Sequence, residues 1–175
     1  QEGYINPATE ALQGRYPIIP STATLRRSTL LSIGGFPEGM RLGEDQWVWI
    51  RLVATGAKFC YSPMSLVRYS RTATNRSAAI YRSEESQHSI EELYSPSQPN
   101  ELNEYIARVG IGKAITQCVR GGTDDAKRAI AAFSYTTLNR RQLRRLRLLT
   151  ALPRTLRITV DGIYRSLAWI VKRRG

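Results

Sequence analysis

The chain has 175 residues, 42% of them hydrophobic, which is enough for a folded core and excludes a polymer without stable structure. Its net charge of +12 favours a polyanionic partner and leaves phosphorylated ligands, anionic bilayers and nucleic acids open. The two cysteines, Cys60 and Cys118, have no metal-ligand spacing and indicate a reducing compartment, and no apolar run is long enough to cross a bilayer.

The sequence does not begin with methionine, and residues 1–13 are predicted to be a loop from within a longer protein. From there to about Ser77, short apolar runs alternate with glycine and proline, which indicates mixed α and β structure. Ser28 is a good helix N-cap, and Gly34 and Gly56 are expected to end helices. The predicted elements are a strand at 18–25, helices at 28–33 and 44–54, and strands at 58–61 and 65–69.

From about Ile80 onward, the apolar spacing is helical almost throughout. We therefore expect an α/β part at 1–77 and a basic helical extension at 78–175. The single histidine, His88, lies in a polar run, which predicts a surface position rather than a metal ligand. The predicted helices of the second part span 78–94, 101–119, 124–136, 140–152 and 154–172.

Two carboxylates, Glu44 and Asp45, stand where a glycine-rich loop leads into the helix predicted at 44–54. They have two interpretations. An acidic side chain in a first turn caps free N–H groups and complements the helix dipole. The same position keeps a carboxylate ionised, so that it can act as a general base. Trp47 and Trp49 follow, and each can either pack in the core or stack on a sugar ring.

The order and spacing of several segments resemble the second half of the catalytic domain of family 2 glycosyltransferases, which have the GT-A fold. The resemblance covers roughly residues 14–77. It implies an α/β fold class: a partial GT-A (nucleotide-diphospho-sugar transferase) sheet with helices, followed by an all-α C-terminal extension. The segments that carry it are 21–27, the Gly34-Gly35-Phe36 turn within 32–38, Glu44-Asp45 with Trp49, Arg51 and Leu52, and the strand pair at 58–69.

The same resemblance implies roles for individual residues. Asp45 would be the general base that takes the proton of an acceptor hydroxyl as its oxygen attacks the anomeric carbon of a nucleotide-sugar. Attack from the face opposite the departing diphosphate would invert the configuration at that carbon. Glu44 would orient the acceptor. The acceptor side of the cleft would be formed by Gly34, Gly35, Phe36, Trp47 and Trp49.

The donor half of such an enzyme carries an Asp-x-Asp metal motif, which does not occur in this sequence. A divalent metal, Mg²⁺ or Mn²⁺, is therefore expected only in the full-length enzyme, and this chain alone is expected to hold none. Many relatives place a histidine after the last strand, and here that segment has none. Three arginines there would contact the diphosphate, or else form a solvated basic loop: Arg68, Arg71 and Arg76.

The last two predicted helices are rich in arginine and leucine, and the second carries an apolar stripe with a helical period. Such a profile is typical of an interfacial amphipathic helix. Three interpretations stay open: the stripe packs on the protein, residues 140–174 contact an anionic membrane surface, or the arginines bind nucleic acid. The stripe consists of Leu156, Val160, Ile163, Leu167 and Ile170.

These observations predict a fragment of an inverting glycosyltransferase of polysaccharide or cell-wall synthesis. Its partners would be a nucleotide-sugar donor and a glycan or lipid-linked acceptor. It would be cytoplasmic, on the inner face of the membrane. The alternative is a basic helical module that binds an anionic membrane or nucleic acid and carries a non-catalytic α/β scaffold.

Overall fold

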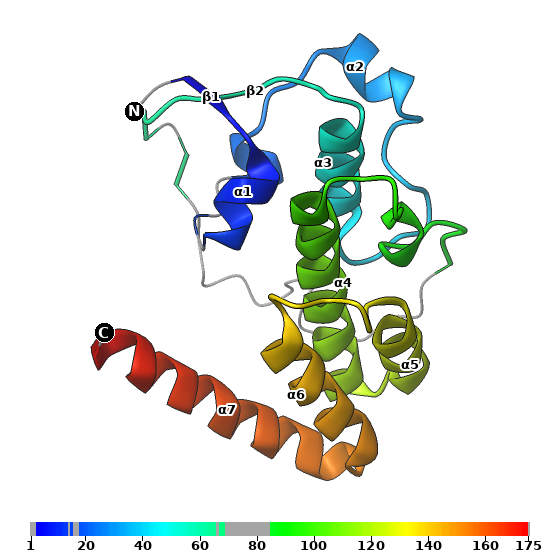
Figure 1. Ribbon diagram of the computed structural model, residues 1–175, viewed down its shortest axis with the longest axis vertical. Coiled ribbons are helices and arrows are strands. Elements are labelled where there is room, and N and C mark those ends of the chain that lie inside the picture. The colour runs from blue at the N-terminus through cyan, green and yellow to red at the C-terminus, as the bar shows by residue number, and fades with distance from the viewer. Residues whose placement is uncertain (1–2, 14, 16–17, 66, 69–84, 175) are drawn as a thin grey trace. The chain divides into compact units, whose positions relative to one another are not determined.

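The computed structural model describes residues 3–13, 15, 18–65, 67–68 and 85–174 (Figure 1). The chain divides by packing into two compact units, Gln1–Val109 and Gly110–Gly175, and the boundary falls inside one helix, α4 (Asn100–Arg120). The division predicted from composition, after residue 77, is a different one and stays a prediction.

The first unit begins with a strand and a helix, β1 (Gly3–Ile5) and α1 (Pro7–Leu12). The prediction of a loop at 1–13 is therefore wrong. The reason is visible in the sequence, because Asn6 is a strong N-cap and Pro7 suits the first helical position. The Asn6 side-chain oxygen accepts from the backbone N–H of Ala8 at 3.0 Å and of Thr9 at 3.4 Å.

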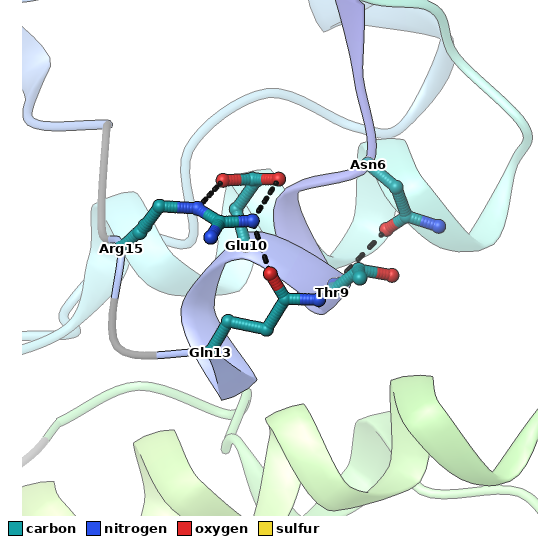
Figure 2. Close-up of polar contacts among 5 residues, drawn as sticks. All are labelled: Asn6, Thr9, Glu10, Gln13 and Arg15. Carbon is teal, nitrogen blue, oxygen red and sulfur yellow. Dashed lines mark hydrogen bonds and ion pairs between the residues drawn. The ribbon is translucent and has the colours of Figure 1, made fainter.

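A polar cluster lies at the other end of α1, and Figure 2 shows it together with the Asn6 cap. The Arg15 guanidinium donates to Glu10 through Nε at 2.6 Å and to the Gln13 side chain. This pairing lowers the pKa of Glu10, because hydrogen bonds from Arg15 stabilise the ionised carboxylate. Arg108, in the first half of α4, donates to the Ala11 carbonyl at 2.6 Å, so that α1 is tied to α4.

The predicted strand at 18–25 is wrong. Pro20 begins a 3₁₀ turn, η1 (Pro20–Thr22), and Thr22 Oγ1 donates back to the Ile19 carbonyl at 3.0 Å. Proline fixes φ and lacks the N–H that a sheet ladder needs, and the local threonine bond competes with strand pairing. The next helix, α2 (Arg27–Ser32), confirms the prediction for 28–33, although Arg26 and not Ser28 occupies the N-cap position.

The helix α3 (Glu44–Ala54) has the predicted bounds. Gly56, at φ +74°, follows it as the C′ residue and donates to the Val53 carbonyl at 3.0 Å. Ala57 donates to the Leu52 carbonyl at 3.0 Å, which completes a Schellman motif. The helix is buried on most of its surface, through Trp47, Val48, Trp49, Ile50 and Leu52.

After α3 comes β2 (Phe59–Tyr61), which pairs antiparallel with β1 so that Gly3 faces Tyr61 and Ile5 faces Phe59. This confirms the strand predicted at 58–61. Among the described residues this pair is the whole sheet, so a partial GT-A sheet stays a prediction. In the strand predicted at 65–69, residues 66 and 69 lie outside the described residues, and the others are irregular.

The predicted helix at 78–94 is wrong where it can be compared. Residues 78–84 lie outside the described residues, 85–90 are irregular, and a short 3₁₀ turn follows, η3 (Glu91–Leu93). This stretch is short of apolar residues that could bury a helical face, and η3 packs against α3 instead. In the same unit, Tyr105 of α4 donates to the Gln46 side chain of α3 at 3.3 Å.

The second unit is helical, as predicted, except that the helix predicted at 124–136 ends at Ala132. Besides the end of α4 it contains α5 (Thr123–Ala132), α6 (Arg140–Ala151) and α7 (Arg154–Arg174). Helices α5 and α6 lie side by side, and α7 leaves α6 after Pro153 (Figure 1). Its core includes Ile111, Ile115, Ala126, Phe133, Leu143, Leu146 and Leu149.

Helix α7 contacts its own unit through polar side chains. Asp161 is buried and accepts from Arg145 of α6 and, at 2.8 Å, from Arg165 of α7. Arg157 is also buried and donates to the carbonyls of Leu152 at 2.8 Å and Cys118 at 3.2 Å. Arg157 and Asp161 each follow a stripe residue by one position, about 100° around the helix, so the apolar stripe lies beside the side that contacts the protein and not on it.

The stripe of α7 is largely exposed where its side chains are described, although Val160 is half-buried. Leu156 is 50% exposed and Ile163 is 56% exposed, so the packing interpretation is wrong for these two residues. The side chains of Leu167 and Ile170 lie outside the described residues. Exposed apolar side chains beside arginines are a feature of surfaces that bind partners.

Candidate functional site

The first unit contains a cleft of about 1030 Å³. Three segments form its walls: the glycine-rich turn that follows α2, one face of α3, and the segment that includes η3. Among the described residues its lining comprises 33–39, Trp47, Ile50, Arg51, Ala54, Glu85, Gln87, His88, Glu92–Leu93, Tyr94, Ser95 and Gln98.

The glycine-rich turn owes its shape to three glycines with positive φ: Gly34 at +90°, Gly35 at +82° and Gly39 at +72°. At Gly39 the requirement is also steric, because an added Cβ would lie 2.8 Å from the backbone nitrogen of Ser86. The Gly39 carbonyl accepts from the Glu85 N–H at 3.3 Å. The turn is thus held directly against the opposite wall of the cleft.

The α3 wall consists of residues three or four positions apart, Trp47, Ile50, Arg51 and Ala54, which share one face of a helix. The Arg51 guanidinium lies 5.3 Å from the centroid of the Trp47 ring. Asp45 precedes Trp47 by two positions, or about 200° around the helix, so it lies on the opposite side. Of the described lining residues, none is Glu44, Asp45 or Trp49.

A polar cluster joins two walls. Trp47 Nε1 donates to Glu92 Oε1 at 2.9 Å, and the same oxygen lies 2.9 Å from His88 Nδ1. The His88 ring lies 5.0 Å from the Trp47 ring between centroids. The surface position predicted for His88 is confirmed, since the side chain is 50% exposed. Its partners, however, were missed by sequence reasoning, although the four-residue spacing of His88 and Glu92 was visible.

The residues predicted for the acceptor side have different positions. Gly34, Gly35 and Phe36 line the cleft, and Phe36 is 45% exposed. Trp47 also lines it but is buried, and Trp49 is buried outside it. The core-packing interpretation therefore describes both tryptophans, and a sugar ring has no access to either face in this structure.

The two carboxylates predicted to be catalytic lie in the first turn of α3, and both are half-buried. Asp45 Oδ1 accepts from the Gln46 N–H at 2.8 Å, and its Oδ2 accepts from Gln46 Nε2 at 3.3 Å. Neither contact uses the full accepting capacity of a carboxylate. The role of these two residues stays a prediction.

The remaining site predictions concern cations. Arg68 is exposed in an irregular segment, while Arg71 and Arg76 lie outside the described residues, so the diphosphate role stays a prediction. In the part of the chain that the structure describes, no group of three or more His, Cys, Asp or Glu side chains is placed to hold a metal ion. Within the same residues, no helix combines the length and apolar character that a membrane crossing requires.

Part of the chain is similar to a known enzyme. A segment of 56 residues, 32% of the chain, is 39% identical to the O-antigen chain rhamnosyltransferase WbaN of Salmonella anatum. The match covers 18% of that protein, so the chain spans less than a fifth of the length of this curated relative. No family model matches the chain. No solved structure matches it.

Proposed function

We propose that this chain is the acceptor-side part of an inverting family 2 glycosyltransferase with the GT-A fold. The enzyme transfers a sugar from a nucleotide-diphosphate sugar to a hydroxyl of a glycan or lipid-linked acceptor. The observation that carries the proposal is the 39% identity of a 56-residue segment to a rhamnosyltransferase. The glycine-rich turn, followed by an acidic pair at the start of α3, supports it.

In this proposal Asp45 is the general base and Glu44 its neighbour at the acceptor. The acceptor O–H gives its proton to the Asp45 carboxylate as the oxygen bonds to the anomeric carbon, and the bond from that carbon to the diphosphate breaks. Trp47 of the cleft lies about 3 Å further along the helix axis than Asp45 and about 200° around it, so the reacting hydroxyl of an acceptor held in the cleft would have to extend around the first turn of α3 to meet the base.

A divalent cation, Mg²⁺ or Mn²⁺, belongs in this proposal to the donor-binding part of the intact enzyme, where it would stabilise the leaving diphosphate. The described residues offer no cluster of metal ligands for it. The arginines at 68, 71 and 76 would assist at the same diphosphate as charge-assisted hydrogen-bond donors.

The proposal is tested by incubating the intact protein with nucleotide-diphosphate forms of rhamnose, glucose, galactose and mannose. Lipid-linked glycans from its own source serve as acceptors. We expect one donor to release nucleoside diphosphate only when the acceptor is present, and NMR of the product to show an inverted anomeric configuration. Retention of configuration, or no transfer from any of a full set of nucleotide-sugars, would contradict the proposal.

We further propose that the second unit binds an anionic membrane surface, which would keep the enzyme on the inner face of the membrane beside a lipid-linked acceptor. The observation that favours this is the outward stripe of α7, with Leu156 and Ile163 exposed. Apolar side chains flanked by arginines match the acyl and phosphate layers of an anionic bilayer. A nucleic acid would use the arginines but leave the stripe in water.

Co-sedimentation with vesicles of phosphatidylglycerol and phosphatidylcholine tests this second proposal. The double change Leu156→Ser with Ile163→Ser is expected to weaken binding about tenfold or more, because two apolar side chains no longer enter the interface. Leu138→Ser is the matched control, since Leu138 is 65% exposed but lies outside α7, and it should bind as the wild type does. Equal loss in both variants, or binding to duplex DNA in place of vesicles, would contradict the proposal.

A further inference from the structure

One oxygen of Glu92 organises the polar wall of the cleft in the first unit. Glu92 Oε1 lies 2.9 Å from both the indole nitrogen of Trp47 and Nδ1 of His88. An ionised carboxylate can only accept hydrogen bonds, so both nitrogens must donate to it. The proton of a neutral His88 ring therefore sits on Nδ1.

The consequence is a free nitrogen with a fixed direction. With Nδ1 protonated, Nε2 of a neutral His88 is a hydrogen-bond acceptor, and no described residue bonds to it. His88 lines the cleft with half of its side chain exposed. Trp47 and Glu92 hold the ring in place, so that Nε2 is presented without a large loss of side-chain freedom on binding.

The charges of the cleft indicate what it binds. The charged groups among its described lining residues, besides His88, are the carboxylates of Glu38, Glu85 and Glu92 and the single guanidinium of Arg51. Glu85 is paired with Arg41, which lies outside the lining, at 3.6 Å, so the described lining has only a small acidic excess in a chain with a net charge of +12. The described residues of the cleft offer no cluster of cations to hold phosphate or diphosphate groups, whereas a neutral ligand rich in hydroxyl groups can bond to carboxylates, amides and imidazole alike.

The cleft also offers an apolar surface. Phe36 lines it beside the two glycines of the turn and is 45% exposed. Pyranose sugars combine hydroxyl groups at their edge with an apolar C–H face, which packs on an aromatic ring. An exposed ring and a directed acceptor nitrogen in one cleft therefore match a neutral saccharide better than a nucleotide.

We propose that this cleft is the subsite for the neutral acceptor saccharide, in which Phe36 packs against a pyranose ring and His88 Nε2 accepts a hydrogen bond from one of its hydroxyl groups. His88 is a binding residue here, and Glu92 and Trp47 are positioning residues that act through it. The inference rests on the proposed glycosyl transfer and deepens it, because it names the place and the class of the acceptor.

The ring nitrogens of His88 provide a first test that needs no ligand. Two-dimensional ¹⁵N NMR of the histidine ring distinguishes the two neutral tautomers, and the His88 signals are assigned by their loss in His88→Ala. We expect protonated Nδ1 and unprotonated Nε2 in the wild type and in the control Glu91→Ala, whose side chain lies outside the cleft lining. In Glu92→Ala the preference should disappear. A proton on Nε2 in the wild type would overturn the proposal.

Titration with methyl glycosides of rhamnose, glucose, galactose and mannose provides the second test. We expect at least one to shift the His88 ring signals, and His88→Ala to bind it three- to tenfold more weakly, as the loss of one hydrogen bond predicts. His88 is exposed, so the variant should fold, and an unchanged melting temperature checks this. Shifts with none of the four, equal affinity in His88→Ala, or displacement of the glycoside by uridine diphosphate would overturn the proposal.

The outcome can be separated from that of the proposed transfer reaction. Glycoside binding at His88 without sugar transfer from any donor would support the proposed subsite and contradict the proposed transferase activity. Sugar transfer with an acceptor KM that does not change in His88→Ala would support the proposed transferase activity and contradict the proposed subsite. A fall in kcat at constant acceptor KM would also overturn the binding role, because it would make His88 a group that acts in the transition state.

Discussion

Replacing Asp45 by Asn in the intact protein is expected to lower kcat for sugar transfer about 10²–10⁴-fold, the usual contribution of a positioned general base. Asparagine has the same shape but takes up no proton. Its side-chain oxygen can still accept from the Gln46 N–H, as Asp45 does at 2.8 Å, so folding should change little. Transfer rates at saturating donor and acceptor, together with a thermal melt of each protein, measure both effects.

Two control variants test whether the effect is specific to Asp45. Asp124 also lies in the first turn of a helix, α5, so Asp124→Asn removes a similar charge from a similar position and should leave transfer unchanged. Glu44→Gln changes the neighbour in the same turn and is expected to have the smaller effect of an orienting residue. Turnover near the wild-type rate in Asp45→Asn would remove Asp45 from the mechanism. Asp45 lies on the side of α3 away from the cleft, so a loss of activity in Asp45→Asn could not be explained by a change in the cleft lining.

The elements that the sequence predicted well are those whose ends are set by local chemistry. The bounds of α3 were correct because a glycine precedes the helix and Gly56 ends it, and both have positive φ. The prediction of a loop at 1–13 was wrong, although Asn6 and Pro7 are an equally local signal for the start of α1. Where such signals exist, they decide the structure more reliably than composition does.

The strand predicted at 18–25 shows the opposite error. Its apolar and β-branched residues favoured a strand, but strands need partners, and Pro20 turns the chain into η1 before pairing can begin. The apolar stripe of α7 was visible as a pattern, but the sequence left open whether it packs on the protein or faces another partner. Periodicity identifies the apolar face, but it does not show that two polar side chains on the neighbouring face, Asp161 and Arg157, are the buried ones.

The cleft could be predicted only in part. Its glycine-rich turn was visible as a motif, because backbone positions with positive φ favour glycine. The cluster around Glu92 was not, because its contact with Trp47 joins residues 45 positions apart, and a single sequence does not show which distant side chains meet. The surface position predicted for His88 is correct. For the same reason, however, the sequence contained no sign that a carboxylate and an indole fix its ring.

Replacing Asp161 by Ala is expected to lower the free energy of unfolding of the second unit by about 3 kcal/mol, the cost of leaving a partner charge buried and unpaired. The Asp161 side chain is 5% exposed and binds Arg145 of α6 as well as Arg165 of its own helix. Without it, Arg145 keeps its contact with the Tyr164 ring, 4.4 Å away, but its Nε already lacks a hydrogen-bond partner. Denaturant unfolding followed by far-UV circular dichroism measures the loss.

The matched control is Asp124→Ala. The Asp124 carboxylate is 84% exposed, and its contact with Lys127 is long, at 3.7 Å. Its removal should therefore lower the free energy of unfolding by less than about 0.5 kcal/mol. A third variant separates burial of charge from loss of packing. In Arg145→Met with Asp161→Leu both charges are absent, and apolar side chains of similar size fill the site between α6 and α7. This double change should therefore be less destabilising than Asp161→Ala alone. If it proves more destabilising, the ion pair itself, and not the avoidance of an unpaired arginine, holds α7 to α6 and sets the outward direction of its apolar stripe.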